Sequence, residues 1–335
     1  MVSWPMMTLS AAFVVPFVIT FLASPLIVRF CRSQGLIKQI TDRHIHRVPT
    51  PHGGGLLIVV VAVSCGLGVI QWAEMELASW LSMMLYLSLL VAAVGWLDDR
   101  RSLGVASRLF MHFFAVSVSV LWMPRLFLTC PEWAEKIVIV FAWTWFVNVY
   151  NFMNGADGLA ESEAVYLGLA MAWLCDALAP LCLVVAGASL GFLRVNWHPA
   201  RVFMGDVGST WMGYVLGGLL LLGAAHSGWR MTWPLATLPL VFGADATWTL
   251  VSRVIRGYKP WQSHREFWFH RALSLGLRHD QMVWRVLAID LVLFVFAWAS
   301  LELGFSMASL PMGLVLVGLV ALRISRLEHR APRSG

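Results

Sequence analysis

The chain has 335 residues, of which 59% are hydrophobic and only 13% are charged. Because soluble domains carry about 25% charged residues, this composition leaves little room for a soluble domain and predicts a membrane protein. The formal net charge is +6, but the basic residues flank apolar runs, which favours membrane topology and anionic headgroups over nucleic acid. We therefore expect one integral-membrane domain over residues 1–335, without a nucleic-acid partner.

A helix that spans a membrane needs about 20 largely apolar residues, and about eleven segments of the chain have that character. The first has no basic residues before it, which predicts a retained span and not a cleaved signal peptide. The fold class expected is therefore all-α and polytopic. In chain order the expected spans run roughly over 6–28, 54–72, 77–97, 108–128, 137–153, 161–178, 180–197, 208–225, 232–252, 283–302 and 304–324.

Lys and Arg are distributed unequally between the two sets of loops. With eleven spans, all but Arg125, Lys136 and Arg230 fall on the side of the C-terminus. The positive-inside rule then places the N-terminus in the periplasm and the C-terminus in the cytoplasm of a bacterial inner membrane. The cytoplasmic loops expected lie at about 29–53, 98–107, 154–160, 198–207 and 253–282.

Acidic side chains occur in these loops beside helix ends and glycines. We single out Asp98, Asp99, Asp157 and Asp206 as candidate catalytic residues. An ionised group near the bilayer is costly and is a functional hypothesis by default, and converging carboxylates repel each other unless a cation binds. Oxygen-only ligands favour Mg²⁺, with Mn²⁺ possible. The alternative for each residue alone is a helix cap or an interfacial side chain.

Polar residues recur at every third position near one expected helix end. Asn148, Asn151, Asn154 and Asp157 share this spacing, which places them on one helical face. The stripe is typical of a binding pocket or of an interhelical hydrogen-bond seam.

Glycine and basic residues mark two further candidate phosphate sites. Gly205 opens the run GDVGS, where backbone N–H groups at a helix start can approach a phosphate. In the last long loop, His264, Arg265, His270 and Arg271 can bind phosphates, or they belong to a basic interfacial helix.

Five motifs follow one another along the chain. They are HRVPTPHGGG at 46–55, GWLDD at 95–99 with Leu103 and Arg108, NVYNFMNGADGLA at 148–160, GFLRVNWHPARVFMGDVGS at 191–209, and the loop from Asp245 and Arg253 to 281. In this order they resemble the polyprenyl-phosphate N-acetylaminosugar-1-phosphate transferases of glycosyltransferase family 4, which include phospho-MurNAc-pentapeptide translocase. The last loop is most similar to the O-antigen-initiating enzymes that use FucNAc, QuiNAc or GlcNAc.

The resemblance implies a Mg²⁺-dependent transfer from a UDP-sugar to undecaprenyl phosphate, with release of UMP, at the start of O-antigen or other cell-surface polysaccharide synthesis. Asp206 and Asp98 would bind the metal, or Asp98 would deprotonate the lipid phosphate, and Asp99 would support it. The substrate-binding residues implied are His46, Asn148, Asn151, Asn154, Asn196, Gly205, His264, Arg265, His270 and Arg271.

The chain departs from the family pattern at three positions. Asn154 stands where Asp is common, His52 where Arg is usual, and Phe267 where the O-antigen subgroup commonly has His. The alternative functions are those of a UDP-GlcNAc-specific transferase, of a transporter or flippase of a lipid-linked sugar, and of a scaffold. A homodimer is possible.

Overall fold

The computed structural model describes residues 4–36, 50–75, 77–126, 129–259, 261–262 and 264–330, with the side chains of 328–330 left aside. Within these residues the chain is all helical, which confirms the fold class. The α-helices are α1 (Met6–Ser33), α2 (Gly55–Trp72), α3 (Ala78–Arg101), α4 (Val105–Leu121), α5 (Glu132–Met153), α6 (Leu159–Leu174), α7 (Ala179–Asn196), α8 (Gly205–Ser227), α9 (Trp229–Thr237), α10 (Leu240–Ile255), α11 (Trp268–Ser274), α12 (His279–Glu302) and α13 (Ser309–Arg330). Short 3₁₀ turns cover Asp176–Leu178 and Ser306–Ala308.

Among the described residues, fewer helices have the length and composition of a membrane span than the eleven segments expected. In the described part of the chain, eight helices are long and apolar enough to cross a membrane, or nine if the pair α9 and α10 counts as one span. The expected spans at 108–128 and 161–178 correspond to α4 and α6, which have only 17 and 16 residues. The expected span at 232–252 is bent by 69° between α9 and α10, where Pro239 precedes α10 and cannot continue a helical hydrogen-bond ladder. The direction of insertion stays a prediction.

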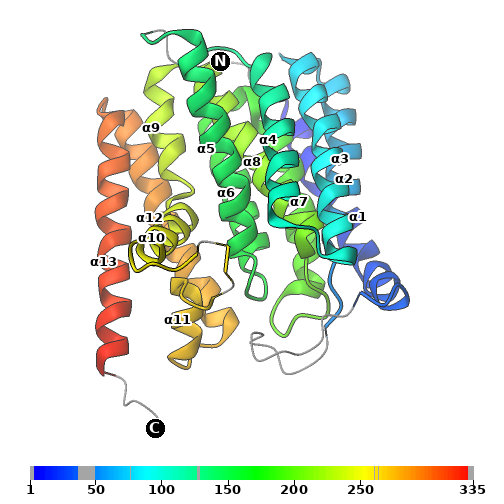
Figure 1. The fold of residues 1–335 in the computed structure, drawn as a ribbon. Helices are drawn as coiled ribbons and strands as arrows, with labels where there is room; N and C mark the ends of the chain where they lie inside the picture. The colour runs from blue at the N-terminus through cyan, green and yellow to red at the C-terminus, as the bar shows by residue number, and fades with distance from the viewer. Residues whose placement is uncertain are drawn as a thin grey trace.

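Helix α8 forms the centre of the bundle (Figure 1), with α2 and α3 on one side and α9, α12 and α13 on the other. In the apolar 18-residue stretch of α8, 94% of the residues are buried inside the protein. Glycines allow α2 and α3 to approach its first turn closely. A Cβ on Gly95 of α3 would lie 2.5 Å from the carbonyl oxygen of Asp206, and one on Gly55 of α2 would lie 2.5 Å from the Cα of Gly208. These contacts fix the first turn of α8 against the end of α3.

The polar motifs meet at one end of this bundle, the end at which α13 finishes (Figure 1). There α3, α5 and α7 end and α4, α8 and α12 begin. Gln34, after α1, accepts a hydrogen bond from Arg100 of α3. The start of α1 lies at the opposite end, where the Trp4 indole donates to the carbonyl of Asp176, between α6 and α7. The fold therefore gathers loops from distant parts of the chain on one face.

Candidate active site

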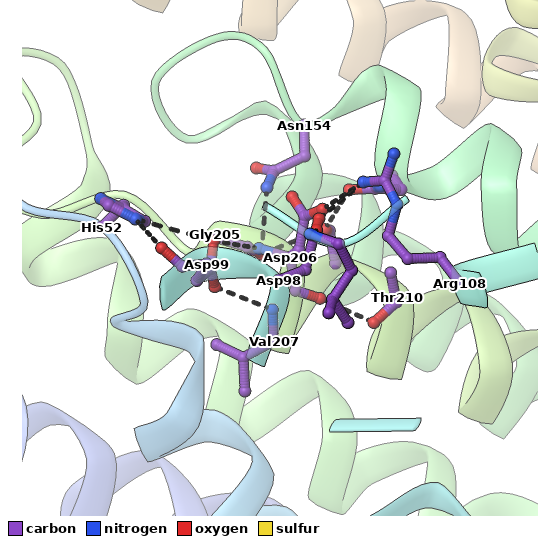
Figure 2. A network of polar contacts seen from close by, with 12 residues as sticks. His52, Asp98, Asp99, Arg108, Asn154, Gly205, Asp206, Val207 and Thr210 are labelled. Carbon is purple, nitrogen blue, oxygen red and sulfur yellow. Dashed lines mark hydrogen bonds and ion pairs between the residues drawn. The ribbon is translucent and has the colours of Figure 1, made fainter. Parts of the chain in front are cut away.

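Asp98 and Asp206 are joined through Arg108. The Nη1 atom of Arg108 lies 2.6 Å from Oδ2 of Asp98 and 3.1 Å from Oδ2 of Asp206 (Figure 2). The side chains are partly accessible, with 9% of Asp98 and 18% of Asp206 exposed. Asp98 also accepts the backbone N–H of Leu103 at 2.5 Å, which turns the chain from α3 into α4 and places Arg108 in the first turns of α4. Two carboxylates thus face one another across a single cation.

Asp99 holds the beginning of α8. Its two carboxylate oxygens accept the backbone N–H groups of Asp206 and Val207, each at 3.1 Å. This is an acidic cap at a helix start, where the helix dipole favours negative charge. Gly205 has a φ of +74° and its Cβ would lie 2.5 Å from Oδ2 of Asp99, so this position requires glycine. The ring of His52 contacts the carbonyl of Asp99 at 3.0 Å. Asp99 thereby positions Asp206, and its predicted catalytic role stays a prediction.

The asparagine stripe of α5 reaches α8 at two of its three positions. Ser209 donates to Oδ1 of Asn151 at 2.7 Å. Asn154 donates to the carbonyl of Gly205 at 3.4 Å (Figure 2). Asn148 instead donates to the carbonyl of Thr144 in its own helix. Asn151 and Asn154 therefore lie beside the first turn of α8. This position agrees with both readings of the stripe, a binding pocket and an interhelical hydrogen-bond seam.

Asp157 contacts a different set of side chains. Its carboxylate is 2.7 Å from Nδ1 of His198 and accepts the backbone N–H of Ala200 at 3.2 Å. The backbone N–H of Asp157 donates to Nδ1 of His279 at 3.0 Å, and the two imidazole rings stack at 5.0 Å. Asp157 is 1% exposed. None of these contacts joins it to Asp98 or Asp206, with which the sequence had grouped it.

Asn196 fixes the same loop from α7. Its Oδ1 accepts the N–H of Gly158 at 2.8 Å, and its Nδ2 donates to the carbonyl of Val202 at 2.9 Å. Both atoms of the amide are therefore used to join the 154–158 loop to the segment that leads into α8.

Of the predicted basic residues, His270 lies beside the Asn154–Asp157 loop. Its ring packs on Phe269 at 4.0 Å, and its Nε2 would lie 3.5 Å from a Cβ on Gly155. Burial lowers the pKa of His270 to about 4, so the imidazole is neutral at pH 7 and does not act as a cation.

The other three basic residues lie farther along the loop. The His264 ring packs against Phe267 at 4.6 Å. Arg271 donates to Ser325 of α13 at 3.2 Å, and together with Arg265 it lines a cavity of about 420 Å³ beside α10. His46 lies outside the described residues.

The oxygen ligands of Asp98 and Asp206 fit a hard divalent cation. Mg²⁺ usually binds proteins through one or two carboxylates plus phosphate oxygens, and the two carboxylates with one guanidinium leave a net negative site. Asp157, His198 and His279 also form a group whose possible ligand atoms all lie within 4.8 Å of one another. There, however, Nδ1 of His279 already accepts a backbone N–H and Nδ1 of His198 already pairs with the carboxylate. The donor chemistry thus favours Asp98 and Asp206 for Mg²⁺.

Sequence reasoning did not select His198 and His279 as site residues. His198 is 41 residues and His279 122 residues from Asp157 in the chain. Neither histidine lies at a helical spacing from Asp157. The one indication in the sequence was that His198 belongs to the polar run NWHPAR, between two expected helices.

Comparison with known proteins identifies the family. Residues 81–224, which contain Asp98, Asp157 and Asp206, match the model of Glycosyl transferase family 4. The probable undecaprenyl-phosphate N-acetylglucosaminyl 1-phosphate transferase of Bacillus subtilis is 25% identical over 95% of this chain and 91% of its own length. The decaprenyl-phosphate N-acetylglucosaminephosphotransferase of Mycolicibacterium smegmatis is 25% identical over 94% of this chain and 87% of its own length.

A higher identity over a shorter region comes from the phospho-N-acetylmuramoyl-pentapeptide-transferase of Geobacillus kaustophilus. It is 32% identical over 65% of this chain and 76% of its own length. This chain belongs to glycosyl transferase family 4.

Proposed function

We propose that this protein transfers an N-acetylhexosamine 1-phosphate from a UDP-sugar to undecaprenyl phosphate, with Mg²⁺, at the cytoplasmic face of a bacterial inner membrane. The observation that carries the proposal is the meeting of Asp98 and Asp206, from α3 and α8, on one nitrogen of Arg108. The printed names of the relatives in Bacillus subtilis and Mycolicibacterium smegmatis support the substrate class.

The reaction exchanges one diphosphate for another. An oxygen of the lipid phosphate attacks the β-phosphorus of the UDP-sugar, the bond from that phosphorus to the UMP oxygen breaks, and UMP leaves with the electron pair. Because one diphosphate linkage forms and one breaks, the step is close to balanced, and catalysis needs mainly positioning and charge neutralisation. A Mg²⁺ ion bound at Asp98 and Asp206 supplies charge neutralisation for the phosphate oxygens.

The residues of the chain divide this work. Asp98 binds the ion or accepts the proton of the lipid phosphate. Arg108, freed from the carboxylates when a cation binds, can pair with a phosphate oxygen. Asp99 accepts the first N–H groups of α8 and so fixes the position of Asp206. Asn154 and His270 lie beside that turn and the 154–158 loop, where uncharged donors can orient a sugar or a nucleotide.

Within this reaction we propose a surface polysaccharide such as O-antigen as the product pathway, and a 6-deoxy N-acetyl sugar such as FucNAc or QuiNAc as one candidate substrate. The 6-deoxy candidate rests on the resemblance of the last loop, because Phe267 and Phe269 beside His270 are buried and offer a sugar no exposed surface. The second candidate is UDP-GlcNAc, which the names of two relatives favour.

The test is a UMP-release assay with purified protein in lipid vesicles that contain undecaprenyl phosphate and Mg²⁺. UDP-GlcNAc, UDP-FucNAc and UDP-QuiNAc are compared, with UDP-glucose as the control without an acetamido group. We expect one N-acetylated substrate to give UMP and a labelled lipid product, EDTA to stop the reaction, and added Mg²⁺ to restore it. Absence of product with every substrate, or activity that persists in EDTA, would contradict the proposal.

A further inference from the structure

A second cavity lies apart from the aspartate site, between α10, α11, α12 and α13. Its volume is about 620 Å³, within the range of ligand pockets, about 300–1,000 Å³. Its wall is largely apolar and includes Trp268, Phe269, Ala272, Met282, Val320 and Ile324. A chamber of this kind suits a hydrocarbon chain.

Two arginines line the same cavity. Arg285 lies in the second turn of α12 and Arg323 near the end of α13, and both are exposed. Neither forms a salt bridge with a carboxylate in the part of the chain that the structure describes; Arg285 donates only to the carbonyl of Gln281. The acidic residue in the wall, Asp245, is 1% exposed, and its oxygens accept the backbone N–H of Trp268 and the hydroxyl of Thr249. The cavity therefore offers two cations to a ligand.

Both arginines lie at the end of the bundle that carries the polar loops. The first residue of α12, His279, contacts Asp157, and Ser325 of α13, two residues after Arg323, accepts a hydrogen bond from Arg271. Charged side chains near the ends of membrane helices extend to the headgroup level. Basic pockets between helices at this level bind anionic lipid headgroups.

We propose that this cavity binds an anionic membrane phospholipid, with an acyl chain against the apolar wall and the phosphate between Arg285 and Arg323. The charges complement a phosphate, and the wall complements a hydrocarbon chain. The proposal separates this occupant from the reacting lipid phosphate, since the wall comes from α10 to α13 and the ends of α5 and α6, whereas Asp98, Arg108 and Asp206 lie on α3, α4 and α8.

The bound lipid touches the loop that carries Asn154 and Asp157. Met153 and Leu159, which flank this loop, form part of the cavity wall, and so does Phe269, which packs on Gly155. An acyl chain in the cavity therefore supports the loop from behind. This consequence for activity rests on the function proposed above, whereas the binding of the lipid does not.

The experiment measures lipid binding directly. Wild-type protein and the variant R285Q/R323Q are reconstituted in vesicles of phosphatidylcholine alone or with a minor fraction of phosphatidylglycerol, extracted in mild detergent, and examined for retained lipid by native mass spectrometry. At about 1 kcal/mol for each basic residue near an anionic surface, we expect retention of phosphatidylglycerol to fall on the order of tenfold in the variant. R326Q removes an exposed charge from the same helix outside the cavity and is expected to retain the lipid as the wild type does.

A second pair of variants tests the chamber itself. V320W fills the cavity and should reduce phosphatidylglycerol retention, whereas V315W adds the same side chain at a position of α13 that is 63% exposed and outside the cavity. Equal retention in R285Q/R323Q and R326Q would overturn the proposal. Retention of undecaprenyl phosphate in preference to phosphatidylglycerol, lost in R285Q/R323Q, would also overturn it, because the occupant would then be the substrate lipid.

Activity provides a separate readout. We expect phosphatidylglycerol to raise UMP release by wild type and R326Q and to leave R285Q/R323Q unchanged. If no UMP forms in any vesicle while lipid retention follows the expected pattern, the catalytic proposal fails and the lipid site stands.

Discussion

Two acidic clusters lie at the same end of the bundle and differ in what surrounds them. In the first, Asp98 and Asp206 share Arg108 and remain partly accessible. In the second, the buried Asp157 is held by two histidines and by the backbone of the segment before α8. In the first cluster, the Arg108 side chain lies between carboxylate oxygens and can move away from them. In the second cluster, the carboxylate and backbone N–H of Asp157 already have hydrogen-bond partners within the cluster.

The difference separates binding of an ion from support of a loop. Asp98 and Asp206 would hold a metal ion with oxygens that now pair with Arg108, so no backbone group would lose its partner. A metal at Asp157 that used the Nδ1 atoms of the two histidines would displace the bond from the Asp157 N–H to His279 and the pair with His198, and a buried N–H without a partner is costly. The contrast predicts that substitutions in the first cluster act on the metal-dependent step, and that those in the second act on the shape of the pocket.

The largest effect is expected from Asp206→Asn. The change keeps the size of the side chain and removes a charge that faces the proposed ion, so UMP release should fall on the order of 10³-fold. The measurement is the initial rate at saturating UDP-sugar over a range of Mg²⁺ concentrations. The thermal unfolding temperature should change little, because Asp99 and not Asp206 holds the first N–H groups of α8. A rate within a few fold of wild type would remove Asp206 from the site.

The sequence was sufficient to predict the membrane class and the family, because long apolar runs and the order of motifs are local properties. It also singled out Asp98 and Asp206, which the structure brings together on Arg108, while their catalytic role stays a prediction. It did not reveal that Asp99 caps α8, because the cap joins residues more than a hundred positions apart.

The expected spans also differ from the helices in length, for a related reason. Hydropathy reports apolar length but not where a helix ends. Helix α6 stops at Leu174 and is followed by a 3₁₀ turn over Asp176–Leu178, and the prolines around α9 divide one apolar run into two bent helices. The grouping of Asp157 with Asp98 and Asp206 likewise came from its spacing and its glycines, and the tertiary contact with His279 gave it other neighbours.

A smaller effect is expected from His279→Ala. The substitution leaves the buried N–H of Asp157 without an acceptor, so the 154–158 loop should shift and the KM for the UDP-sugar should rise about tenfold. The Mg²⁺ concentration for half-maximal rate should stay as in wild type. His279→Asn is the matched control, because its amide oxygen can take the place of Nδ1 and should recover most of the loss. A changed metal requirement in His279→Ala, or activation by Zn²⁺ that depends on His279, would make the second cluster a metal site and break the distinction.

The smallest effects separate two asparagines of the same helix. Asn151→Ala removes the acceptor of the Ser209 hydroxyl and one link between α5 and the first turn of α8, so the rate should fall by about fivefold, the value of one neutral hydrogen bond. Asn148→Ala removes only a bond to Thr144 within the same helix, and the rate should stay within about twofold of wild type. Both rates are measured as UMP release at low and at saturating UDP-sugar. If Asn148→Ala is the more damaging of the two, Asn148 contacts the substrate directly, and the polar stripe of α5 continues deeper into the bundle than the links to α8 indicate.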